Sequence, residues 1–359
     1  MKIAFLWCGA ITAGWSAGDG LANALRKAGH LVLGFPRGRQ ECPALSVEAL
    51  NKADAIIVSG PEHILRAHVK GDGPNGYNFT DDELTIYDWK HAVKPPKIFM
   101  YHESNHREDQ TFGFEDYLTY GDYHFFPAIQ DAETYDQDHF AKERSFWLPF
   151  GIDTDVFHPV LCHACKDWRV LKTNCKLCLG SGFMSNPKDV EVGFVGLRYP
   201  KRQLFIERLA EHMKRGRDPN LVIGHSQVLD MTGPAWLDQA NRLAMNYRRC
   251  MVFLNMPSYS ELLVSKVAEV MACGTFMLTP IQEGRAQPNC NQFTHGKELA
   301  YYSPTNLPFL VQTMREFVER EELREQIALA GAAKVREKYS LKVQIPEILS
   351  KVAVKEIVQ

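Results

Sequence analysis

Short apolar segments alternate with amphipathic helical segments along this chain, and this alternation restricts the fold more than any other feature. In the first half, the segments with strand character are residues 2–7, 30–35, 53–60, 96–104 and 120–128. The segment at residues 21–29 has helical spacing and ends on a glycine. A second alternation begins near residue 190, and its segments with strand character are residues 190–196, 221–225, 250–255 and 275–280. Such alternation predicts an α/β protein with parallel sheets and crossover helices.

The length of the chain and the break between the two alternations predict its domains. The 359 residues suit two α/β domains of roughly 150 residues each. We predict an N-terminal Rossmann-like domain at residues 1–150 and a linker with an insertion at 151–190. A second Rossmann-like domain follows at 191–335, and a C-terminal helix at 336–359 returns to the N-terminal domain.

The segment from about residue 307 onward is charged and has helical spacing. Two apolar faces are expected there, the first formed by Leu310, Met314 and Phe317 and the second by Leu323, Ile327 and Ala330.

Charge, hydropathy and cysteine usage exclude several classes of protein. The 41 basic and 43 acidic residues give a net charge of -2, so no overall basic field points to nucleic acid or anionic membrane. No apolar run is long enough to predict a membrane-spanning helix, and the apolar start fits a first strand and turn better than a signal peptide. Five of the nine cysteines are scattered singly, which favours a reducing compartment, the cytoplasm.

Two glutamates in the second half carry the strongest catalytic signal. Glu261 and Glu269 stand eight positions apart in a segment that ends at Gly274. On a helix this spacing is roughly 12 Å of rise and about 80° of rotation, so both carboxylates can face one cleft. Ser258 or Ser260 is a candidate N-cap, and the helix N-terminus offers free amides to a diphosphate. The alternative is an ordinary amphipathic helix with two exposed acids.

This segment resembles the donor-site motif of the group 1 (family 4-like) retaining glycosyltransferases, E-x7-E before a small-residue helix end. Residues 265–274 are similar in particular to the CgeB-like branch. The resemblance implies a GT-B fold, with two Rossmann-like domains facing a cleft and the nucleotide sugar on the C-terminal one. It implies Glu269 as the ribose ligand, with Ser265 and Lys266 also at the donor, and Glu261 beside the donor sugar.

The sequence departs from that family directly after Glu261. The family has Gly-Phe-Gly there, and this chain has Leu262-Leu263-Val264. We therefore expect the phosphate contacts to come partly from elsewhere in the chain.

Two further segments are candidates for those contacts. Residues 17–35 resemble the family's Gly-rich first loop and helix, where Gly18 and Gly20 permit close backbone approach to a phosphate. A simple turn between strand and helix is the alternative, and the glycine spacing does not fit dinucleotide binding. Arg198 and Arg202 lie in a segment similar to the first strand and loop of the donor domain, where cations stabilise a departing diphosphate. A solvated basic loop is the alternative, and no donor metal is implied.

His102 and Glu103 end the predicted strand at 96–104, and in parallel sheets the carboxyl edge faces the cleft. His102 matches a family position that contacts the donor sugar and phosphate. In an inverting reaction, Glu103 would be the natural general base. The alternative for His102 is an ordinary residue at a strand end.

The remaining four cysteines form two CxxC pairs separated by nine residues: Cys162 with Cys165, and Cys175 with Cys178. Two such pairs can supply the four ligands of a tetrahedral structural zinc site. An iron–sulfur site and unrelated thiols are the alternatives. The surrounding segment is locally basic, with one tryptophan, so a DNA or RNA acceptor is a candidate partner.

These features together predict a glycosyltransferase. It would move a hexosyl or pentosyl group from a UDP- or GDP-linked donor to a nucleic-acid base or another polymer. Transfer with retention is implied by the family resemblance alone. A nucleotide-sugar epimerase and a non-enzymatic, zinc-containing nucleic-acid-binding protein are the alternatives. The sequence identifies neither the sugar, the base, the acceptor nor the oligomeric state.

Overall fold

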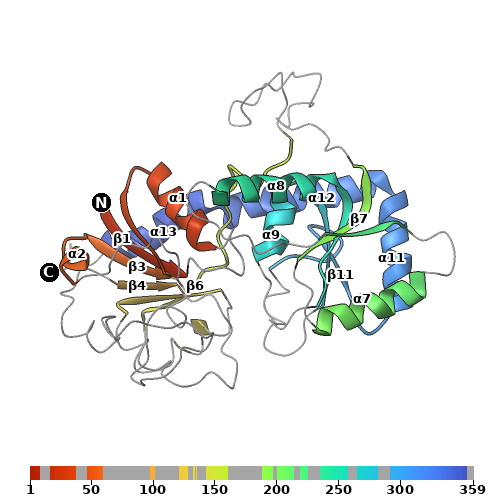
Figure 1. Ribbon diagram of the computed structural model, residues 1–359, viewed down its shortest axis with the longest axis horizontal. Coiled ribbons are helices and arrows are strands. Elements are labelled where there is room, and N and C mark those ends of the chain that lie inside the picture. Colours follow the sequence, from red (N-terminus) through yellow and green to blue (C-terminus); the bar gives the residue numbers. More distant parts are fainter. Residues whose placement is uncertain are drawn as a thin grey trace. The chain divides into compact units, whose positions relative to one another are not determined.

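The protein forms two compact units in a computed structural model (Figure 1). Unit 1 comprises Met1–Gly151, Val228–Trp236 and Leu341–Gln359, and unit 2 comprises Ile152–Gln227 and Leu237–Ser340. The structure describes residues 1–8, 17–37, 47–59, 98–101, 121–127, 132–133, 135, 143–160, 188–196, 200–213, 219–224, 235–257, 265–281 and 292–353.

Unit 1 contains a six-stranded sheet in the order β2-β1-β3-β4-β5-β6, and every neighbouring pair is parallel. The apolar runs of the sequence form these strands because a parallel sheet buries both of its faces. The strands are β1 (Lys2–Cys8), β2 (Leu31–Arg37), β3 (Ala55–Ser59), β4 (Ile98–Tyr101), β5 (Tyr123–Phe126) and β6 (Ser145–Trp147).

The helices described in unit 1 are α1 (Ala17–Lys27), α2 (Val47–Asn51) and α13 (Leu341–Ala353). The last of these comes from the far end of the chain and packs beside α1. Its residues Leu341, Ile345 and Ile348 are buried in one core with Phe5 and Leu25. The C-terminal helix thereby completes the core of the N-terminal sheet.

Unit 2 contains a five-stranded parallel sheet in the order β11-β10-β9-β7-β8. The strands are β7 (Val190–Val195), β8 (Leu221–Gly224), β9 (Cys250–Leu254), β10 (Phe276–Pro280) and β11 (Ala300–Tyr302). Apolar side chains on β9 and β10 are almost completely buried, as expected for the centre of such a sheet.

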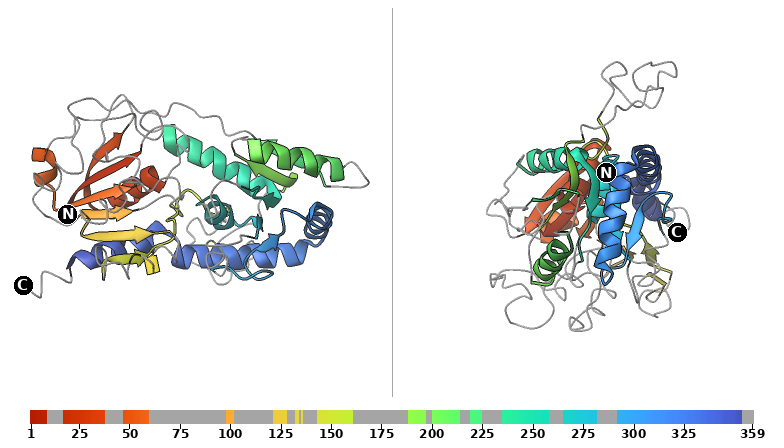
Figure 2. Two further views of the ribbon diagram at one scale, coloured as in Figure 1. Left: turned by 90° about the horizontal axis from the view of Figure 1, so that it is seen from below. Right: turned by 90° about the vertical axis from the view of Figure 1, so that its right-hand side faces the viewer.

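Helices cover both faces of the sheet in unit 2 (Figure 2). One face is covered by α7 (Pro200–Met213) and α11 (Leu307–Glu319), which contact each other. The other face is covered by α8 (Ala235–Arg249), α9 (Ser265–Ala272) and α12 (Glu321–Lys338). Among the described residues, no helix is both long and apolar enough to cross a bilayer.

The predicted parallel sheets and crossover helices are confirmed, with differences in detail. The short strands β6 and β11 lie in segments for which the sequence predicts no strand. Leu310, Met314 and Phe317 of α11 are buried as predicted. Of the predicted face of α12, Ile327 is buried, whereas Leu323 and Ala330 are exposed. The other buried residues of this helix are Arg324, Ala328, Gly331, Ala332 and Val335.

Candidate functional site

The strand order of unit 2 defines where a ligand can bind. The chain passes from β7 to β8 on one side and then returns to β9 on the other side of β7. In open parallel sheets, ligands bind outside the carboxyl ends of the strands at such a switch point. Because α7 follows β7 and α9 follows β9 in the chain, the first turns of both helices lie next to this point.

Two cations meet at the carboxyl end of β7. The Arg202 guanidinium carbon, from the first turn of α7, and Lys266 Nζ, from the first turn of α9, each lie 4.9 Å from the centroid of the Phe194 ring. A Cβ atom added to Gly196, directly after β7, would lie 2.8 Å from Lys266 Nζ and 3.2 Å from Arg202 Nη1. The absence of a side chain at Gly196 therefore leaves room for both cations beside the backbone.

The surroundings of these cations favour an anion. Arg202 is only 5% exposed, and Lys266 is partly buried. Burial and the nearby Arg202 charge lower the pKa of Lys266 to about 8, although Glu269 acts in the opposite direction. Two positive groups removed from water in this way are stabilised by a bound anion, such as a diphosphate.

A buried carboxylate lies one turn further along α9. Glu269 is 3% exposed, and its Oε2 accepts a hydrogen bond from the Tyr247 hydroxyl at 3.2 Å. The Ser265 side chain also hydrogen-bonds this carboxylate. Burial raises the pKa of Glu269 to about 7, against the effects of Lys266, Tyr247 and Ser265. A carboxylate offers about four acceptor positions, so it can also bind a diol.

The structure brings together four of the predicted donor-site residues: Arg202, Ser265, Lys266 and Glu269. Sequence reasoning missed Phe194, Gly196 and Tyr247. Gly196 directly follows the strand 190–195, the first strand of unit 2. A glycine at that position could have been recognised from the sequence as a candidate for close approach to a ligand. Tyr247 has no such signal, because one aromatic residue on an amphipathic helix is indistinguishable from core.

Other predicted residues lie outside the described part of the chain. These are His102, Glu103, Arg198, Glu261 and the candidate caps Ser258 and Ser260. Helix α9 is described from Ser265 onward.

Gly18 and Gly20 lie in the first turn of α1. A Cβ atom on Gly18 would lie 2.6 Å from Trp7 Cδ1, so the indole of β1 fills the space beside this glycine. A Cβ atom on Gly20 would lie 3.6 Å from Leu341 Cδ1, an ordinary contact. Gly18 therefore has a packing reason to be glycine, and its contact with a phosphate stays a prediction.

Cys162, Cys165, Cys175 and Cys178 also lie outside the described residues. Within the described ranges, no group of three or more His, Cys, Asp or Glu side chains is arranged to hold a metal ion. The zinc site therefore stays a prediction.

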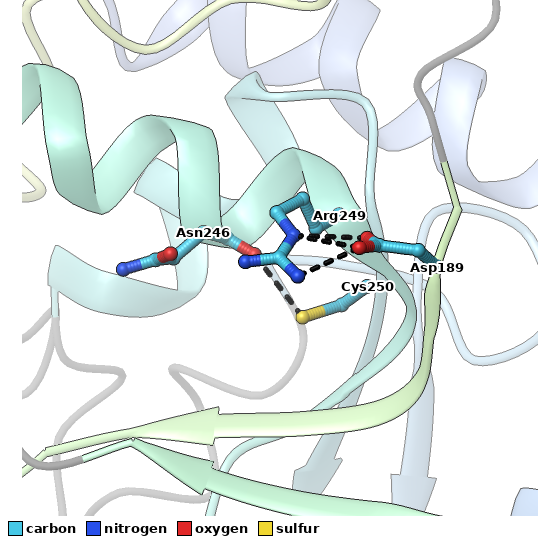
Figure 3. Close-up of polar contacts among 4 residues, drawn as sticks. All are labelled: Asp189, Asn246, Arg249 and Cys250. Carbon is cyan, nitrogen blue, oxygen red and sulfur yellow. Dashed lines mark hydrogen bonds and ion pairs between the residues drawn. The ribbon is translucent and has the colours of Figure 1, made fainter.

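The four cysteines lie in residues 162–178, which we call the cysteine-containing segment. Residues on both sides of this segment form hydrogen bonds with the end of α8. On the preceding side, Arg248 donates to the carbonyl oxygens of Val156 at 3.0 Å and His158 at 2.6 Å. On the following side, Asp189 accepts hydrogen bonds of 2.6–3.0 Å from Arg249 (Figure 3). Figure 3 also shows the Cys250 thiol, which donates to the Asn246 carbonyl oxygen at 3.2 Å.

A second contact holds the following flank. Lys188 Nζ donates to the Cys250 carbonyl oxygen at 2.7 Å and to Thr275 Oγ1 at 3.3 Å. Two consecutive arginines at the end of α8 therefore contact the residues on either side of this segment.

A comparison with protein families covers the second half of the chain. Residues 201–350 match a protein family described as glycosyl transferase-like. The matched segment runs from α7 into α13 and includes Arg202, Lys266 and Glu269. No curated protein matches the sequence significantly.

Solved structures resemble the chain over nearly its whole length. Sucrose-phosphate synthase from Thermosynechococcus elongatus is 14% identical, with a TM-score of 0.60 over 99% of this chain and 100% of that one. An alpha-glucosyltransferase in complex with UDP-glucose and DNA containing an abasic site is 10% identical, with a TM-score of 0.61 over 98% and 99%. Anabaena Alr3699/HepE in complex with UDP and glucose is 13% identical, with a TM-score of 0.58 over 98% and 99%. The fold is therefore α/β and GT-B-like.

Proposed function

We propose that this protein is a glycosyltransferase that takes a hexosyl or pentosyl group from a UDP- or GDP-linked donor bound to unit 2. One observation carries the proposal: Arg202, Lys266 and the buried Glu269 converge at the switch point between β7 and β9. Arg202 and Lys266 bind the diphosphate, and Glu269 accepts hydrogen bonds from the ribose diol.

The chemistry of glycosyl transfer explains why two cations are useful there. When the bond between the anomeric carbon and the diphosphate breaks, negative charge accumulates on the leaving oxygen. Fixed positive groups stabilise that charge more than they stabilise the bound donor, which lowers the barrier. The family match over residues 201–350 and the similar structures that contain UDP, glucose or UDP-glucose support this assignment.

We propose roles for five further residues from the resemblance stated above. Arg198, with Gly18 and Gly20, contributes to phosphate binding. For a reaction with retention, His102 and Glu261 contact the donor sugar. The anomeric configuration of the product tests this part, because an inverted product would instead assign Glu103 as the general base.

For the acceptor we propose a nucleic acid bound mainly to unit 1 and to the cysteine-containing segment. The support is the basic character of that segment and the fold shared with an alpha-glucosyltransferase solved with DNA. Transfer of labelled sugar to duplex DNA, single-stranded DNA and RNA tests the proposal. Transfer only to saccharides would contradict it.

We further propose that Cys162, Cys165, Cys175 and Cys178 hold one structural zinc ion. The support is the CxxC spacing and the closely placed ends of the segment. Metal analysis of the purified protein should give about one zinc per chain. Cys175→Ser should remove the zinc. Cys273→Ser, at a buried cysteine outside this segment, is the control and should leave the zinc bound.

A thermal-shift screen of nucleotide sugars tests the proposed function, because a ligand of the native state raises the melting temperature. The donor that binds is then assayed for transfer, with Glu269→Ala and Arg202→Met as variants. Conversion of the free nucleotide sugar without an acceptor would indicate an epimerase. Nucleic-acid binding that survives Glu269→Ala, without turnover of any sugar nucleotide, would indicate a non-enzymatic binding protein.

A further inference from the structure

A buried tyrosine contacts the Glu269 carboxylate, and donor binding as proposed assigns it no role. Tyr247 lies in the last turns of α8, is completely buried and donates its hydroxyl hydrogen to Glu269 Oε2 at 3.2 Å. Its ring lies edge-on to Phe253 at 5.1 Å between centroids and tilted against Phe157 at 6.2 Å. The Thr275 hydroxyl donates to the Tyr247 carbonyl oxygen at 2.8 Å. Neighbouring groups therefore fix both the ring and the backbone of Tyr247.

Packing alone does not explain why residue 247 is a tyrosine with a hydroxyl group. A phenylalanine would make the same ring contacts, and a buried hydroxyl costs free energy unless it is hydrogen-bonded. Burial and the adjacent Glu269 raise the pKa of Tyr247 well above its ordinary value, so the phenol stays protonated. The Tyr247 hydroxyl therefore stays a hydrogen-bond donor to Glu269 throughout the neutral pH range.

Contacts from two helices restrict the Glu269 side chain. Tyr247 reaches it from α8, and Ser265 reaches it from the preceding turn of α9. A free glutamate side chain samples several rotamers, whereas binding both hydroxyls of a diol requires one orientation. Fixing that orientation before the ligand arrives removes part of the entropic cost of binding. The acceptor positions not used by these two contacts can then face the ligand.

We propose that Tyr247 is a positioning residue for the donor: its hydroxyl holds Glu269 in the orientation that accepts the two ribose hydroxyls. This inference rests on the proposed function, because it assumes that Glu269 is the ribose ligand. Tyr247 itself is completely buried and acts only through Glu269.

The test compares Tyr247→Phe with the wild type in calorimetric titrations with UDP and 2′-deoxy-UDP, or with the GDP pair if the wild type prefers GDP. We expect the variant to bind UDP about fivefold to tenfold more weakly, the size of one lost hydrogen bond. Its preference for UDP over 2′-deoxy-UDP should shrink by a similar factor. In the transfer reaction, the donor KM should rise while kcat changes little.

The matched control is Tyr339→Phe. Tyr339 is a buried tyrosine that donates to Gln292 Oε1 at 2.9 Å, away from Glu269. This variant loses the same single hydroxyl, so it should keep the wild-type nucleotide preference and donor KM.

A pH profile gives a readout that a purely structural role would not change. Among the described residues, the titratable groups that interact with Glu269 are Lys266 of α9, Tyr247 of α8 and Cys273 at the end of α9, and Arg202 of α7 acts on Lys266. Burial raises the pKa of Cys273 to about 12, so this thiol stays neutral. The Tyr247 hydrogen bond lowers the pKa of Glu269, so its removal raises that pKa. As the pH is lowered, Glu269 is protonated and loses acceptor capacity. UDP affinity should therefore begin to fall at a higher pH in Tyr247→Phe than in the wild type.

The outcomes separate this inference from the function on which it rests. If the wild type binds neither UDP nor GDP, the proposed donor site is wrong. If the wild type binds UDP and Glu269→Gln weakens that binding, the donor site stands. A Tyr247→Phe variant that then keeps the wild-type nucleotide preference and pH profile, with or without a lower melting temperature, would overturn the positioning role.

Discussion

The two units begin with the same topology but use the start of that topology differently. In each sheet the second strand lies on one side of the first and the third strand lies on the other, as β2-β1-β3 in unit 1 and β8-β7-β9 in unit 2. In unit 2, a Cβ atom on Gly196 would meet the edge of the Phe194 ring and also the charged ends of Lys266 and Arg202. In unit 1, a Cβ atom on Gly18 would meet the indole of Trp7.

This difference shows that a glycine near the first strand has two separate physical uses. At Gly196 the missing side chain leaves space for cations and, in our proposal, for the diphosphate between them. At Gly18 the space belongs to Trp7, whose ring also lies against Gly34 of β2. The first use affects ligand binding, and the second affects packing. Substitutions at the two positions should therefore separate affinity from stability.

The largest effect is expected from the charged groups of unit 2. In our proposal, Glu269→Ala removes the two hydrogen bonds that the ribose hydroxyls donate to a charged acceptor, so donor kcat/KM should fall at least about 100-fold. Arg202→Met should have a similar effect, because it keeps the apolar stem and removes the cation. Steady-state kinetics with varied donor concentration measures both changes. Glu298→Gln, which alters a carboxylate paired with Lys334 instead, is the control, and unchanged kinetics in Glu269→Ala would refute the site.

Glu269→Gln is expected to stabilise the free protein at high pH. The folded-state pKa of Glu269, about 7, lies above its ordinary value of 4.5. The stability that this group contributes is therefore fully present below pH 4.5 and is lost as the pH rises through 7. Glutamine avoids that loss, so the variant should gain up to about 3 kcal/mol over the wild type at pH 8.

Thermal or urea unfolding at pH 8 and pH 5 checks this difference, which should be smaller at the lower pH. A variant less stable than the wild type at pH 8 would show that the Glu269 carboxylate is compensated by its neighbours. In that case the buried Glu269 carboxylate would not reduce the stability of unit 2 in the absence of a ligand.

Gly18→Ala should reduce stability and leave donor affinity unchanged. The new methyl group would overlap the nearly buried Trp7 indole, and such overpacking costs about 1–3 kcal/mol. Alanine regains at most about 1 kcal/mol through its higher helix propensity. Urea unfolding and a UDP titration on the same sample test both expectations. Weaker UDP binding at unchanged stability would instead support the predicted contact between Gly18 and a phosphate.

Gly196→Ala should show the opposite pattern and the smallest effect of the series. Its Cβ atom would overlap the ends of Lys266 and Arg202, which can move aside, and the edge of the Phe194 ring. We expect donor affinity to fall about tenfold, or about 1.4 kcal/mol. The melting temperature should change less than in Gly18→Ala. A variant that binds UDP normally would mean that the phosphate lies away from the end of β7.

The fold was largely predictable from the sequence because buried parallel strands produce continuous apolar runs. The strands of unit 2 at 190–195, 250–254 and 276–280 were all predicted for this reason. The three-residue strands β6 and β11 were not, since so short a run has no periodicity. On α12 the predicted apolar face was right only at Ile327, because backbone approach also decides burial. Gly331 is buried there against the backbone of Glu298, and no apolar pattern marks such a contact.

The sequence by itself determined which residue types could form a donor site. Glu269 was identified from its spacing to Glu261 and from a resemblance. Lys266 was identified from the resemblance, and Arg202 from the resemblance and its charge, because diphosphate chemistry requires cations. Only the tertiary structure decided which of them meet and what surrounds them. In the structure, Tyr247 from another helix donates a hydrogen bond to Glu269, and the Trp7 indole fills the space beside Gly18. The physical reason is that burial and hydrogen bonding depend on neighbours distant in the chain, which local spacing does not encode.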